Sequence, residues 1–63
     1  MNAPDRIYEY LLENGKQTNA DLVKKFDLFP KQVTYALKKL MRKGKIIKIP
    51  NLSDMRSIFY EVY

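Results

Sequence analysis

The sequence predicts a small, mainly α-helical domain with a β-hairpin: an α+β arrangement in which three helices are followed by two strands. Apolar residues recur at helical spacing in three segments, and each segment is bounded by residues that favour helix ends. Two β-branched and aromatic runs then follow, separated by a polar turn. A chain of 63 residues with 46% hydrophobic content has room for one core, so residues 1–63 are expected to form a single domain.

The first two predicted helices are short and carry recognisable end signals. The first is expected over Pro4–Glu13, because proline suits a first turn and Asn14-Gly15 supplies a left-handed stop. The second is expected over Asn19–Lys25. Thr18 would be its cap, and Asp21 three residues later resembles a weak capping box.

The third predicted helix runs from Pro30 to Lys43 and stops at Gly44. Its apolar residues repeat at i, i+3, i+4, i+7 and i+8: Val33, Ala36, Leu37, Leu40 and Met41. This period buries one face and forces the charged residues onto the other. Phe29 stands at the cap position and offers no side-chain oxygen, so water or a nucleic-acid phosphate is expected to satisfy the first amides.

The hairpin is predicted from two strand-like runs near the end of the sequence. Ile46–Ile49 is β-branched and ends at Pro50, and Ile58–Tyr63 is the second run. Residues 51–57 are expected to form the turn between them.

Charge is segregated along the chain, whose net charge is +5. Residues 28–53 contain no acidic residue and the following basic ones: Lys31, Lys38, Lys39, Arg42, Lys43, Lys45 and Lys48. Residues 1–15 carry Asp5, Glu9 and Glu13 against Arg6 alone. A buried helix with a basic outer face is suited to lie against nucleic acid, so the distribution predicts a polyanionic partner.

The composition argues against catalysis and metal chemistry. The chain has no histidine and no cysteine, and its two glycines mark helix ends rather than a phosphate-binding loop. The acidic residues of the first helix lie on an open ridge, where a solvated stripe is expected rather than a metal site. We therefore expect no enzyme activity, no cofactor and no bound metal. Without an apolar run of about 18 residues or a signal segment, an intracellular, cytoplasmic or nucleoid-associated protein is expected.

Three helices followed by a hairpin resemble the winged helix-turn-helix, and specific segments carry the resemblance. Ala20–Phe26 is similar to a first motif helix, Pro30–Leu40 to a recognition helix, and Lys43–Ile47 to the junction between helix and wing. Regulators of the MarR, ArsR and related groups share this fold. Asp54-Met55-Arg56 also resembles the Asp-x-Arg of MarR-type wings, in which the aspartate holds the wing and the arginine reaches the minor groove.

The resemblance implies sequence-specific binding to double-stranded DNA by a small transcriptional regulator, with the third helix in the major groove and a wing over residues 50–57 on the flanking backbone or minor groove. Base readout is expected from polar side chains near the start of that helix: Gln32, Thr34 and Tyr35. Backbone contacts are expected from Lys31, Lys38, Lys39, Arg42, Lys45 and Lys48. Wing contacts are expected from Asn51, Ser53 and Arg56, although Arg56 could equally pair with Asp54 or stay exposed.

A homodimer is expected at least on DNA, because one small module reads few base pairs. Its interface would come from the first helix, with Tyr8 or Tyr10, or from the last strand, which ends at Tyr63. Most aromatic residues are expected to pack in the core, whereas Phe29 and Tyr63 should remain exposed.

Two alternatives remain. One is a winged-helix module that binds an acidic protein through its basic face. The other is a Zα-type domain that reads left-handed duplex. Such domains use an asparagine and a tyrosine on the recognition helix and a tryptophan in the wing. This chain has Thr34 and Lys38 at the first two positions and no tryptophan, so this alternative ranks low.

Overall fold

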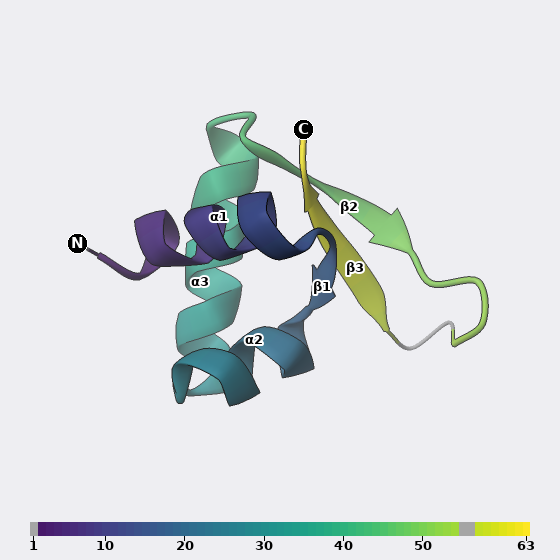
Figure 1. The fold of residues 1–63 in the computed structure, drawn as a ribbon, viewed down its shortest axis with the longest axis horizontal. Helices are drawn as coiled ribbons and strands as arrows, with labels where there is room; N and C mark the ends of the chain where they lie inside the picture. The colour runs from purple at the N-terminus through teal and green to yellow at the C-terminus, as the bar shows by residue number, and fades with distance from the viewer. Residues whose placement is uncertain (1, 55–56) are drawn as a thin grey trace.

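The computed structural model describes residues 2–54 and 57–63. In chain order the elements are α1 (Ala3–Asn14), β1 (Gln17–Thr18), α2 (Asn19–Phe26), α3 (Pro30–Arg42), β2 (Ile46–Pro50) and β3 (Ile58–Val62). The three helices and the β2–β3 hairpin confirm the fold class and lie within one residue of the predicted bounds. Figure 1 shows α1 lying across α3, α2 near one end of α3, and the sheet to one side.

The strand β1 is an addition that the sequence did not predict. The sheet has the order β1-β3-β2, and β1 pairs antiparallel with β3 through Gln17 opposite Tyr60 and Thr18 opposite Phe59. The hairpin itself pairs in register from Ile46 opposite Val62 to Pro50 opposite Ile58. Two residues are too few to show the alternation of a strand, and the pattern around Thr18 indicates only a helix cap.

All three helices and the strand β2 contribute to one small core. Its fully buried side chains are Ile7, Leu11, Leu22, Val33, Ala36, Leu37, Leu40 and Ile46. Half of them come from α3, so the apolar face of that helix is fixed inward as its period predicted. Phe29 and Tyr63 are 75% and 88% exposed, which confirms that these aromatics are left outside the core.

The helix α2 begins with a complete capping box. Thr18 Oγ1 accepts a hydrogen bond from the Asp21 amide at 3.1 Å, and Asp21 Oδ2 accepts one from the Thr18 amide at 3.1 Å. Both bonds satisfy amides that a helix start leaves open. The weak box expected from the sequence is therefore a full one.

The ends of α3 are fixed differently. At its start, Gln32 Oε1 accepts a hydrogen bond from the Phe29 amide at 2.9 Å, while Phe29 provides no side-chain cap. At its end, the Gly44 amide donates to the Met41 carbonyl and the Lys45 amide to the Leu40 carbonyl, both at 3.0 Å. This pattern needs a left-handed residue, and Gly44 adopts φ 72° without the steric cost of a side chain.

Over the described residues, no helix has the length and apolar character needed to cross a membrane.

Candidate nucleic-acid interface

The outward face of α3 is basic and exposed. At 3.6 residues per turn, the side opposite the buried residues presents Lys31, Tyr35, Lys38 and Arg42, and all four are exposed. Tyr35, the aromatic residue of this face, is 64% exposed. Lys39 lies to one side of this face and is half-buried.

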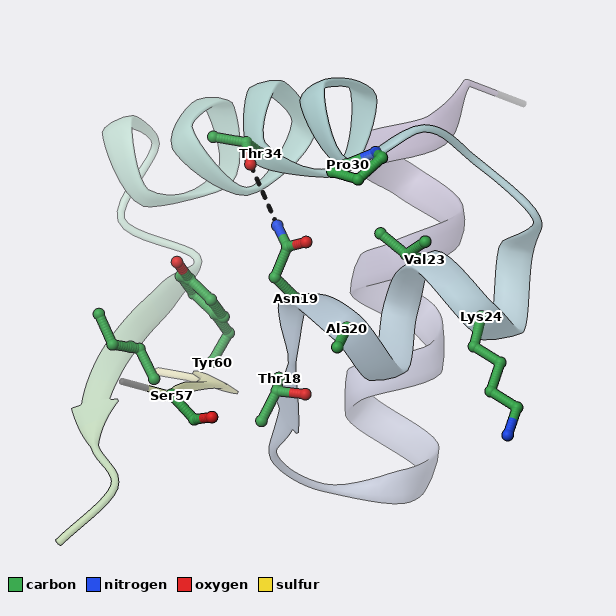
Figure 2. Close-up of a pocket in the computed structure, with 10 residues that line it drawn as sticks. Thr18, Asn19, Ala20, Val23, Lys24, Pro30, Thr34, Ser57 and Tyr60 are labelled. Carbon is green, nitrogen blue, oxygen red and sulfur yellow. Dashed lines mark hydrogen bonds between the residues drawn. The ribbon is translucent and has the colours of Figure 1, made fainter. Parts of the chain in front are cut away.

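An open groove of about 590 Å³ lies between α2, α3 and the base of the wing. Its lining combines apolar and polar side chains, including Thr18, Asn19, Lys24, Pro30, Thr34 and Ser57 (Figure 2). A smaller hollow on α3, with Lys31, Tyr35 and Lys38, shares Pro30 and Thr34 with this groove. Another, with Lys48, Pro50 and Asn51, shares Ser57 and Ile58. The concave surface thus continues from the outward face of α3 to the wing.

The predicted base-reading residues lie in different surroundings. Thr34 faces the groove, and its Oγ1 accepts a hydrogen bond from Asn19 Nδ2 at 3.1 Å. Gln32 lies about 160° from Thr34 around the helix axis, and its carbonyl oxygen is bonded to the Phe29 amide. Tyr35 projects from the outward face beside Lys31 and Lys38. The structure therefore brings Thr34 and Tyr35 to the concave surface and folds Gln32 back toward the start of α3.

Elsewhere in the described part of the chain, four basic side chains lie over aromatic rings. The Lys45 ammonium is 5.1 Å from the Tyr8 ring centre, and Lys25 is 5.5 Å from that of Tyr10. Arg6 over Phe26 and Lys16 over Phe59 make similar contacts at 5.3 and 4.8 Å. Lys45, which the sequence assigned to the DNA backbone, is therefore directed toward α1.

The wing turn is held by Asn51. Asn51 Oδ1 accepts hydrogen bonds from the Ser53 and Asp54 amides at 3.0 and 3.2 Å. At the other side of the turn, the Ser57 amide donates to the Asp54 carbonyl at 3.0 Å, and the Ser57 hydroxyl lies 3.4 Å from Asp54 Oδ2. Leu52 is 85% exposed in this turn. Asn51 thus has a structural role besides the predicted wing contact, and Arg56 lies outside the described residues.

The acidic residues Asp5, Glu9 and Glu13 are exposed on α1. Within residues 2–54 and 57–63, no group of three potential metal ligands comes together.

Several polar residues that line the groove were not assigned to the site from the sequence, among them Asn19, Lys24 and Ser57. Asn19 and Thr34 are 15 residues apart and on different helices, so no local period links them. Lys24 could have been found from the sequence, because a basic residue on the helix before α3 adds to the positive surface.

The chain is similar to a family of DNA-binding domains and to several solved structures. A family model described as winged helix-turn-helix DNA-binding matches residues 5–47. Similar solved structures include the adhesin competence repressor AdcR from Streptococcus pyogenes, at 25% identity and a TM-score of 0.93, covering 100% of this chain and 46% of that protein. A ZitR mutant from Lactococcus lactis is 30% identical with a TM-score of 0.88, covering 95% of this chain and 45% of ZitR.

The C80S mutant of MarR from E. coli, complexed with operator DNA, has a TM-score of 0.91 at 21% identity and shows the shared fold. That match covers 100% of this chain and 45% of MarR, so the chain spans less than half the length of each of these three proteins. No curated protein matches this sequence. The family match covers more than half of the chain, including α2, α3 and all of α1 but its first two residues. The chain therefore belongs to the winged helix-turn-helix DNA-binding family.

Proposed function

We propose that this domain binds double-stranded DNA sequence-specifically, as the DNA-reading part of a transcriptional regulator. The observation that carries the proposal is the continuous concave surface from the basic face of α3 to the wing. A helix with such a face fits the major groove, and a wing beside it reaches the flanking backbone or minor groove. The MarR neighbour is complexed with operator DNA, which supports DNA as the partner of this domain.

Base edges would be read from α3. Tyr35 and Thr34 lie on the concave surface, where a threonine methyl group can meet the methyl group of thymine. The Gln32 amide nitrogen can still donate to a base while its oxygen accepts from the Phe29 amide.

Backbone phosphates would be held by cations on and beside the outward face of α3 and by one on the strand β2. These are Lys31, Lys38, Lys39, Arg42 and Lys48. Lys45 can join them only by leaving the Tyr8 ring. In the wing, Ser53 and Asn51 would add polar contacts, and Arg56 remains a candidate for the minor groove.

A homodimer on DNA is part of the proposal, because two half-sites multiply both affinity and specificity. Of the predicted interface residues, Tyr63 is 88% exposed, whereas Tyr8 and Tyr10 pack partly against the core under lysine side chains. The last strand is therefore the better candidate for the contact between protomers.

Titration of duplex DNA at several salt concentrations tests the proposal. We expect log affinity to fall with log salt at a slope of about −0.9 for each neutralised phosphate, with roughly four to six phosphates for each protomer. Gln32→Ala and Tyr35→Ala should reduce the difference between the preferred duplex and random duplex, whereas Lys38→Ala and Arg42→Ala should weaken both equally. A flat salt response, or retention on an acidic protein in preference to duplex, would favour a protein-binding module instead.

A further inference from the structure

The amide of Asn19 joins α2 to the recognition helix. Asn19 is the first residue of α2, and its Nδ2 donates a hydrogen bond of 3.1 Å to Thr34 Oγ1 in α3. Figure 2 shows the two side chains meeting at the groove, with the Thr34 methyl group turned aside from Asn19. This contact connects the helices at the point where α3 faces the groove.

Asn19 is also connected to the strand β3 through the residue before it. Thr18, its neighbour, pairs with Phe59 of β3 and caps α2 through the two bonds of the capping box. A continuous series of contacts therefore runs from the wing strand β3, through β1 and the start of α2, to Thr34 on α3.

We propose that Asn19 is a positioning residue for DNA recognition. Threonine in a helix divides between two χ1 rotamers, because its hydroxyl can bond back to the preceding turn. The bond from Asn19 selects the rotamer that turns the hydroxyl toward α2, and so fixes the direction of the methyl group. The methyl group then meets a thymine methyl group in the major groove. This inference rests on the proposed function, and it assigns part of the sequence specificity to a residue outside the recognition helix.

The test replaces thymine by deoxyuracil, which removes only the C5 methyl group, at each thymine of the preferred duplex in turn. Wild-type protein should lose affinity at one position by about fourfold, the usual effect of removing one buried methyl group. Thr34→Ser keeps the hydroxyl but lacks the methyl group, so it should show no loss at that position. Asn19→Ala should bind with a clearly reduced loss there, because the methyl group is no longer held in one direction.

A second measurement needs no DNA and separates the inference from the proposed function. Three-bond NMR couplings of Thr34 in the free protein should report one χ1 rotamer in the wild type and an average in Asn19→Ala. Asn19→Asp supplies an acceptor for the Thr34 hydroxyl and should restore a single rotamer. Asn14→Ala is the matched control, since the Asn14 amide donates to Tyr10 within α1 and should change neither result.

The outcomes are distinct. A single Thr34 rotamer and an undiminished thymine-to-uracil loss in Asn19→Ala would overturn the positioning role while leaving DNA binding intact. No loss at any thymine in the wild type would also overturn it. If the wild type does not distinguish any duplex from random DNA, the proposed function fails together with this inference.

Discussion

Replacing Thr18 by alanine should destabilise the whole domain, because Thr18 is the point where the sheet meets α2. The substitution removes Thr18 Oγ1, which accepts a hydrogen bond from the Asp21 amide at 3.1 Å. It therefore breaks one half of the capping box. Loss of a threonine cap costs about 1 kcal/mol of unfolding free energy, within a range of about 0.5 to 2. In a domain of this size, about 1 kcal/mol corresponds to a decrease in Tm of about 4–8 °C.

Thermal unfolding followed by circular dichroism measures this effect. Thr18→Ser retains the hydroxyl oxygen and should recover most of the lost stability. Asn2→Ala removes the cap of α1, a single bond from the Asp5 amide, and should lower Tm less because Asn2 takes no part in the sheet. The reasoning would be refuted if Thr18→Ala melted within about 1 °C of the wild type, or if Thr18→Ser were as unstable as Thr18→Ala.

Three further predictions follow from the core, the basic residues and the assembly. Leu37→Ala should reduce the free energy of unfolding by about 2–5 kcal/mol in urea titrations, because it leaves a cavity in the core, where Leu37 is 1% exposed. A loss below about 1 kcal/mol would contradict the burial. Lys38→Ala should reduce the slope of log affinity against log salt by about 0.9. Lys45→Ala should leave this slope nearly unchanged, because Lys45 lies over Tyr8. Equal changes in the two variants would show that Lys45 also reaches a phosphate. Sedimentation of the protein on its best duplex should give two protomers for each duplex. The two half-sites should lie about 10 base pairs apart, or a multiple of that. A one-to-one complex with a footprint shorter than one helical turn would contradict the dimer.

The sequence predicted those parts of the fold that local patterns determine. The period of Val33, Leu37 and Leu40 identified the buried face of α3, and Gly44 marked its end, because both signals lie within a few turns of one helix. The strand β1 gave no such signal, since its two residues become a strand only by pairing with β3, about 40 residues later in the chain. A long-range pairing of this kind leaves no period in the sequence.

The candidate site was predictable at the level of a surface rather than of individual contacts. The basic face of α3 could be read from the sequence, because charges opposite an apolar stripe must point outward. The bond between Asn19 and Thr34 could not, because it depends on how α2 crosses α3. The contact of Gln32 with the Phe29 amide was partly predictable, since glutamine three residues after a cap position can reach back to the cap amide.

The most direct test of DNA recognition by α3 and the wing is an NMR titration of isotope-labelled protein with duplex DNA. We expect the largest chemical-shift changes along Pro30–Arg42, at Asn19 and Lys24, and at Lys48 and Ser57 in the wing, with little change at Glu9 and Glu13 on the acidic side of α1. Changes concentrated on α1 or on the outer face of the sheet, with α3 unaffected, would contradict the account.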